Sequence, residues 1–268
     1  MPAALSYDAQ PICYSVQGQG EPHVILVHGW SCDQSFWRNQ VPFLASECTV
    51  VTLDLAGHGA SGSGRARWTI RSFAKDVIAV LSELAFPQSI LVGHSMGGAV
   101  ALEAARVFKN RVIGIIGVDS LIYPDDSRMG SKEIRDGLAP LKADFRTTVT
   151  KLVGDLFPPG ADAATVAWAS QVMASAAPEI AIPSLRALLD WDFRPSLAQV
   201  DIPVVCICSA QLAADIDLSQ FGGHFDITLL PNTGHFPMLE IPSVFNEVLA
   251  GAIRAIAEGR GSSSGRPA

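Results

Sequence analysis

The sequence predicts an α/β protein whose core is a mostly parallel sheet flanked by helices. Two observations predict this class. From residue 24 onward, short apolar runs typical of buried strands alternate with helix-like segments, and this alternation is the pattern of a parallel sheet. Within residues 88–106, an apolar run and a helix-like run are joined by a tight, glycine-flanked turn. A chain of 268 residues is long enough to bury the core that such a sheet needs.

The predicted strands are short, apolar and bounded by turn residues. In chain order they cover residues 23–27, 49–53, 88–92, 111–118, 202–207 and 226–230. The residues before position 22 predict, in addition, an antiparallel hairpin at the edge of the sheet.

The predicted helices of the core cover residues 33–45, 69–84, 99–106 and 243–257. The first of them contains Pro42, which is expected to break it because proline lacks the N–H that a helix interior needs. The second has apolar residues at helical spacing, among them Phe73, Val77 and Leu84, so we expect it to bury one face.

The alternation stops after the strand that ends at residue 118. From residue 121 to about residue 195 there is no strong strand, and helical stretches such as 144–156 and 163–176 dominate. We therefore predict a helical insertion in an otherwise continuous sheet. The expected organisation is a first core part (1–120), a helical insertion (121–195), a second core part (196–258) and a flexible Gly/Ser-rich tail (259–268).

Composition and charge argue against several classes of partner. The formal net charge is −7 and the sequence has no basic cluster, so we expect neither nucleic acid nor an anionic membrane as a partner. Residues 1–10 lack the features of a secretion signal, and no apolar run reaches the roughly 18 residues of a membrane span. The five cysteines show no zinc spacing, so we expect reduced thiols, a cytoplasmic location and no metal. The oligomeric state stays open.

The glycine-flanked turn carries the strongest indication of chemistry. It reads Gly93-His94-Ser95-Met96-Gly97 and matches the pattern Gly-x-Ser-x-Gly. A serine at a sharp turn between a strand and a helix is a nucleophile elbow. The serine hydroxyl then lies at a helix N-terminus, where backbone N–H groups stabilise developing negative charge. We therefore predict that Ser95 is a nucleophile.

A serine nucleophile needs a base to take its proton, and histidine suits this role because its pKa lies near neutrality. Of the six histidines, His235 follows the last predicted strand. A loop after that strand can lie over the carboxyl edge of the sheet, which is also where the turn presents Ser95. His235 is therefore the predicted base.

Four segments together resemble the α/β-hydrolase superfamily, over nearly the whole chain. They are His28-Gly29-Trp30, Asp54-Leu55-Ala56-Gly57-His58-Gly59-Ala60-Ser61, Gly93-His94-Ser95-Met96-Gly97-Gly98 and Gly234-His235-Phe236-Pro237. The resemblance implies an α/β-hydrolase fold with a sheet of about eight strands and a helical cap inserted after the sixth, which corresponds to residues 121–195. It also implies an oxyanion hole formed by the backbone N–H groups of Trp30 and Met96.

The acid that would orient His235 has two possible positions. Most members of the superfamily carry it in a Gly-x-x-Asp pattern after the strand that here covers residues 202–207, but this sequence has no carboxylate there until Asp215 and Asp217. Some members carry it one crossover earlier, and Asp119 stands at that position. We favour Asp119 and keep Asp215 and Asp217 as alternatives.

The expected function is hydrolysis of small to medium carboxylic esters through an acyl-enzyme, with no metal or organic cofactor. A serine at the turn argues against haloalkane dehalogenase and epoxide hydrolase chemistry, which the resemblance associates with aspartate there. Apolar candidates for contact with the substrate are Phe36, Leu121, Ile122 and Phe236, beside Trp30 and Met96. Two alternatives remain: a C–C bond hydrolase, thioesterase or lactonase with the same residues, or a hydrolase-fold protein that binds a ligand without turning it over.

Overall fold

The structure is a computed structural model that describes the chain except for residues 123–129, 215, 222–224 and 260–268. Within the described residues one sheet of eight strands has the order β1-β2-β4-β3-β5-β6-β7-β8. In that order the strands are β1 (Ala3–Leu5), β2 (Pro11–Gln17), β4 (Thr49–Leu53), β3 (His23–Val27), β5 (Ser89–His94), β6 (Val112–Val118), β7 (Val204–Ser209) and β8 (Asp226–Leu230).

The sheet confirms the predicted fold class. β1 and β2 form an antiparallel hairpin at one edge, and β2 also pairs antiparallel with β4. From β4 to β8 all neighbouring strands are parallel. The carboxyl ends of β3, β5, β6, β7 and β8 therefore share one edge of the sheet, which is where ligands bind in open parallel sheets.

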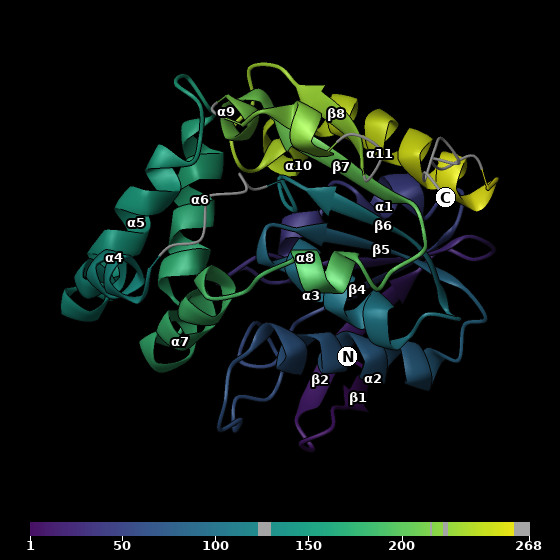
Figure 1. Ribbon diagram of the computed structural model, residues 1–268, viewed down its shortest axis with the longest axis horizontal. Helices are drawn as coiled ribbons and strands as arrows, with labels where there is room; N and C mark the ends of the chain where they lie inside the picture. Colours follow the sequence, from purple (N-terminus) through teal and green to yellow (C-terminus); the bar gives the residue numbers. More distant parts are fainter. Residues whose placement is uncertain (123–129, 215, 222–224, 260–268) are drawn as a thin grey trace.

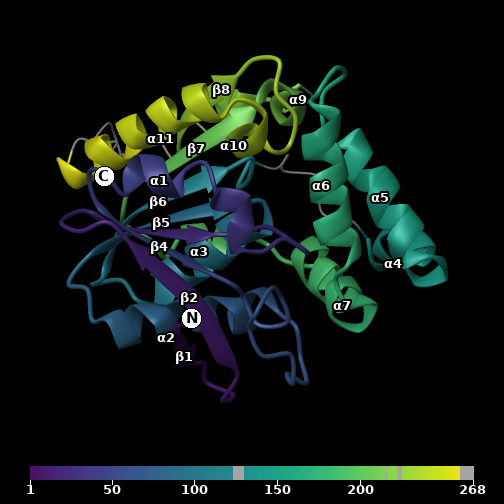
Figure 2. The same ribbon diagram turned by 180° about the vertical axis from the view of Figure 1, so that it is seen from behind.

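Helices cover both faces of the sheet (Figures 1 and 2). One face carries α2 (Ile70–Leu84) and α3 (Met96–Val107), and the other carries α1 (Val41–Leu44) and α11 (Pro242–Ala257). Helix α2 begins at Thr69, which forms a reciprocal capping box with Ser72. Both N-terminal orphan amides at this helix end are thereby satisfied, so the start predicted from the sequence is confirmed.

One predicted helix is wrong in detail. Residues 33–45 form a 3-10 turn, η1 (Gln34–Trp37), followed by the separate helix α1. Pro42 lies in the first turn of α1, where a helix needs no donor from it. The proline therefore belongs to the start of a second helix and does not break a single one.

Between β6 and β7 the described chain is helical. The helices are α4 (Ser131–Ala143), α5 (Phe145–Asp155), α6 (Ala163–Ala174), α7 (Pro178–Leu189) and the short α8 (Arg194–Leu197). Helices α4 to α7 form a group beside the carboxyl edge of the sheet (Figure 1). Helices α4 and α7 contain Pro140 and Pro183 in their interiors. Proline usually ends a helix, so these two helices are hard to recognise from the sequence.

The remaining short elements are α9 (Ala210–Ala213), η2 (Leu218–Phe221) and α10 (Pro237–Glu240). Among the described helices none is by itself long and apolar enough to cross a membrane; α6 and α7 taken together meet that test, but they are bent by 101°.

A buried ion pair connects the N-terminal hairpin to α2. The carboxylate of Asp76 is fully buried and accepts hydrogen bonds from Arg65 (2.5 and 3.0 Å), from the Ser6 hydroxyl (2.6 Å) and from the Ala56 N–H (3.1 Å). Arg65 also binds Asp8 at 2.7 Å. This network fixes the loop after β4 against the core.

Replacement of Asp76 by asparagine should strongly destabilise the protein, because the buried Arg65 charge loses its main partner. We expect the free energy of unfolding to fall by about 3–5 kcal/mol, measured by urea denaturation. The matched control is Asp136→Asn, since Asp136 forms an exposed pair with Lys132 and such pairs contribute little. Equal, small effects of the two substitutions would contradict this account.

Candidate active site

Ser95 occupies a strained turn between β5 and α3. Its backbone has φ 52° and ψ −118°, a conformation that residues with side chains rarely adopt and that is found at functional sites. The flanking glycines are required sterically. A Cβ on Gly93 would overlap the carbonyl of Gly97, and one on Gly97 would overlap the carbonyl of Val27. The turn therefore has the geometry of a nucleophile elbow.

The structure brings His235 and Asp119 into contact. Asp119 follows β6 and its Oδ2 lies 2.6 Å from Nδ1 of His235, while its Oδ1 accepts a hydrogen bond from the Ser209 N–H at 2.7 Å. The Asp119 side chain is 2% exposed and that of His235 is 21% exposed. With Nδ1–H donating to the carboxylate, Nε2 is the ring nitrogen that remains to accept a proton.

Of the three candidate acids, Asp119 is the one that the structure places against His235. Asp217 accepts hydrogen bonds from the backbone and hydroxyl of Ser219 on the surface. Asp215 lies outside the described residues. The geometry therefore favours the earlier of the two positions for the acid.

The loop with Trp30 passes directly beside Ser95. A Cβ on Gly29 would lie 2.8 Å from Nδ1 of His94 and 3.3 Å from Cβ of Ser95, so a side chain here would force its neighbours to shift. The Trp30 indole donates to the carbonyl of Ala181 in α7 at 2.7 Å, and Met96 is the fully buried first residue of α3. The two predicted oxyanion donors thus belong to segments on either side of Ser95.

The four predicted substrate-contacting residues, Phe36, Leu121, Ile122 and Phe236, are all fully buried. The rings of Phe36 and Phe236 lie 5.9 Å apart, and that of Phe236 lies 5.2 Å from the His235 ring. Two aromatic residues of the inserted segment extend this group: Trp168 lies 4.8 Å from Phe36, and Phe157 is stacked on Phe236 at 4.9 Å. Contact of these side chains with a substrate stays a prediction.

Two histidines brace the loops around Ser95. His94 is buried and its Nε2 bonds to the carbonyl of His235 at 2.8 Å. Nε2 of His28 accepts from the Leu55 N–H at 3.0 Å, which ties the loop before Trp30 to the loop after β4. Burial lowers the pKa of His94 well below its ordinary value and that of His58 to about 3, so both rings are neutral near neutral pH.

Comparison with known proteins shows the family to which the chain belongs. The model of the alpha/beta hydrolase family matches residues 24–248. The chain belongs to the α/β-hydrolase family. It is 30% identical to a pimeloyl-[acyl-carrier protein] methyl ester esterase of Edwardsiella ictaluri over 91% of this chain and 96% of that one. It is 27% identical to karrikin insensitive 2 receptor IA of Petunia hybrida, over 89% and 92% of the two chains.

Among solved structures, a thermophilic esterase from Thermogutta terrifontis superposes on this α/β hydrolase with a TM-score of 0.81. The superposition covers 95% of this chain and 98% of that one, at 21% identity. This likeness supports the fold.

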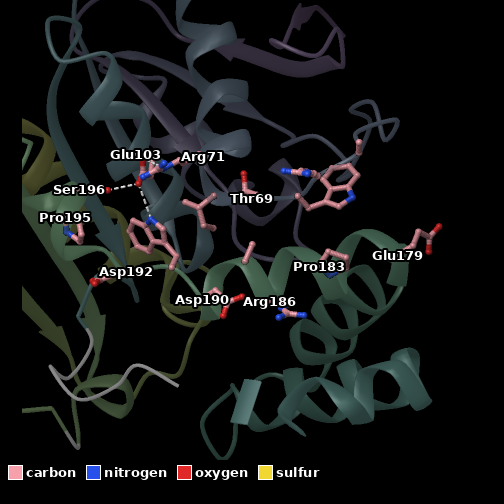
Figure 3. A pocket seen from close by; sticks show the side chains of 16 residues that line it. Thr69, Arg71, Glu103, Glu179, Pro183, Arg186, Asp190, Asp192, Pro195 and Ser196 are labelled. Atoms are coloured by element: carbon pink, nitrogen blue, oxygen red, sulfur yellow. Dashed lines mark hydrogen bonds and ion pairs between the residues drawn. The ribbon is translucent and has the colours of Figure 1, made fainter. Parts of the chain in front are cut away.

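The hydrolase also has a cavity away from Ser95. Its volume is about 770 Å3, and it lies between the start of α2, helix α3 and the segment α7–α8 (Figure 3). The buried carboxylate of Glu103 borders it and accepts from Ser196 at 2.6 Å and from Trp191 at 3.2 Å. None of the predicted site residues lines this cavity, so it is distinct from the candidate active site.

The sequence did not predict the further residues that fix the positions of His235 and Asp119. The N–H of Ser209 donates to Asp119, and the carbonyl of Leu156 accepts from the His235 N–H at 2.8 Å. His94 and Glu240 also contact the loop that carries His235. Backbone contacts leave no mark in a single sequence. His94 lies inside the Gly-x-Ser-x-Gly motif and Glu240 follows His235 closely in the sequence, and that proximity was the available signal. Among the described residues, no group of three or more His, Cys, Asp or Glu is arranged to hold a metal ion.

Proposed function

We propose that this hydrolase-family protein cleaves small to medium carboxylic esters, with Ser95 as nucleophile, His235 as base and Asp119 as acid. The observation that carries the proposal is the 2.6 Å contact between Asp119 and Nδ1 of His235 in a chain whose Ser95 lies at a strained turn. The similarity to a methyl ester esterase supports ester chemistry.

In the proposed reaction, Oγ of Ser95 attacks the ester carbonyl while Nε2 of His235 takes the hydroxyl proton. Asp119 stabilises the imidazolium that forms. The backbone N–H groups of Trp30 and Met96 stabilise the oxyanion, and one such donor is typically worth about 3–4 kcal/mol of the barrier. The intermediate collapses to an acyl-enzyme, and His235 returns the proton to the departing alcohol.

The second half of the reaction repeats these roles with water. His235 removes a proton from a water molecule as it attacks the acyl carbonyl, and it then protonates Oγ of Ser95 as the carboxylic acid leaves. No step needs a metal or an organic cofactor, because protons and electron pairs move only among the substrate, water and these three side chains.

The inserted residues 121–195 act as a cap in this proposal. Two contacts support it: the Trp30 indole bonds to Ala181 in α7, and the carbonyl of Leu156 binds the His235 N–H. The aromatic group around Phe36 and Phe236, which includes Trp168 of α6, favours an apolar acyl or alcohol group of the substrate.

A second candidate is a ligand-binding protein without turnover. The similarity to a karrikin insensitive 2 receptor of Petunia hybrida favours it. Both candidates use the same pocket chemistry, so they differ in whether a bound ester is cleaved.

A panel of p-nitrophenyl esters separates the two candidates. We expect measurable kcat/KM for acetate, butyrate and octanoate esters and a much lower value for palmitate, since the proposed substrates are small to medium esters. Labelling with a fluorophosphonate, followed by peptide mass spectrometry, should place a single adduct on Ser95. Failure to cleave any ester of the panel, together with no adduct, would favour the binding protein.

A further inference from the structure

The loop that carries His235 is held by one side chain on both of its flanks. Glu240, at the end of α10, accepts the N–H of Gly234 with Oε2 at 2.7 Å and the N–H of Phe236 with Oε1 at 2.9 Å. The two amides lie directly before and after His235. Hydrogen bonds from neutral donors to an ionised carboxylate are about twice as strong as neutral pairs, so this carboxylate clamps the backbone of the proposed base.

Building on the proposed function, we propose that Glu240 is a positioning residue for His235: its carboxylate fixes the amides on both flanks of His235. This clamp sets where Nε2 of the ring lies relative to Ser95.

Other contacts fix the His235 backbone but bring no charge. The His235 N–H donates to the carbonyl of Leu156 at 2.8 Å, and its carbonyl accepts from Nε2 of His94 at 2.8 Å. Burial lowers the pKa of His94 well below its ordinary value, so this ring stays neutral. Together with the Glu240 clamp, these two bonds hold the backbone of residues 234–236.

The titratable side chains that face His235 in the described part of the chain are Asp119 at the end of β6, His94 at the end of β5 and Glu240 on α10. Burial raises the pKa of the Glu240 carboxyl, and the nearby Asp119 carboxylate also raises it. The N–H groups of Gly234 and Phe236 lower this pKa, as does His235. Because Glu240 is half-buried, its charge is screened less than that of a surface carboxylate.

Three variants test the clamp formed by Glu240. Glu240→Gln removes the charge and one acceptor at nearly constant shape, and Glu240→Asp keeps the charge but is too short to reach both amides. The matched control is Glu247→Gln, since Glu247 lies exposed on α11 and has the same charge change. The measurements are kcat and KM with p-nitrophenyl butyrate, and the amide NMR signals of Gly234 and Phe236, which report the two hydrogen bonds without substrate.

We expect Glu240→Gln to lower kcat by about 10- to 100-fold with little change in KM, as a displaced base would. The amide NMR signals of Gly234 and Phe236 should shift upfield in the same variant, because the hydrogen bonds to Glu240 are weakened or lost. Glu240→Asp should show a similar loss in kcat and similar shifts. Glu247→Gln should change neither.

Wild-type amide signals for Gly234 and Phe236 in Glu240→Gln and Glu240→Asp, or equal changes in Glu247→Gln, would overturn the clamp. Shifted amide signals with a wild-type kcat would overturn the positioning role, and Glu240→Asp decides alone if Glu240→Gln does not fold. The amide signals need no substrate, so they test the Glu240 contacts even if the wild type cleaves no ester and the proposed function fails.

Discussion

Replacement of Ser95 by alanine should remove most of the rate enhancement for ester hydrolysis and leave only the part that the oxyanion hole and substrate binding supply. In serine hydrolases whose triad acts as a unit, loss of the nucleophile alone costs about 10⁶-fold in kcat. Alanine keeps the Cβ and therefore the backbone strain at φ 52°, so the fold and the position of the turn should be retained. The measurements are the steady-state kcat/KM for p-nitrophenyl butyrate and the burst phase that an acyl-enzyme produces.

The matched control for this substitution is Ser46→Ala, because Ser46 is exposed and its hydroxyl only caps the Phe43 carbonyl. It should keep wild-type kcat/KM. Fluorophosphonate labelling should disappear in Ser95→Ala and persist in Ser46→Ala. Turnover that survives the loss of Ser95 would refute the acyl-enzyme mechanism for this chain.

The sequence predicted the core because each signal there is local. The parallel strands are continuous apolar runs, and α2 has its own capping residues. The turn at Ser95 is marked by Gly93 and Gly97, which must be glycines because backbone carbonyls lie where a Cβ would be. These features depend on neighbours in the chain or on steric demands that one residue type can meet.

The parts that sequence reasoning missed depend on contacts between distant segments. Helices α4 and α7 tolerate Pro140 and Pro183 inside them, and only packing against the neighbouring helices makes such helices stable. The aromatic group near His235 joins Phe36 to Trp168, more than a hundred residues apart. Spacing along the chain carries no record of such pairs.

The sequence left three candidates for the acid that orients His235. Replacement of Asp119 by asparagine tests the candidate that the geometry favours. Asparagine fills the same space but offers an amide where Nδ1–H of His235 now meets a carboxylate at 2.6 Å. The ring then loses the partner that holds its tautomer and that stabilises the imidazolium, and the expected loss in kcat is about 10⁴-fold.

The same substitution at the rival position provides the control. Asp217→Asn should leave kcat within a factor of a few, because Asp217 bonds to Ser219 on the surface. Since Oδ1 of Asp119 also accepts the Ser209 N–H at 2.7 Å, Asp119→Asn can keep that bond through its own oxygen, and its amide group must then face the ring. The loss should therefore appear in kcat with the fold intact. Near-wild-type kcat in Asp119→Asn combined with a large loss in Asp217→Asn would move the acid to the loop after β7.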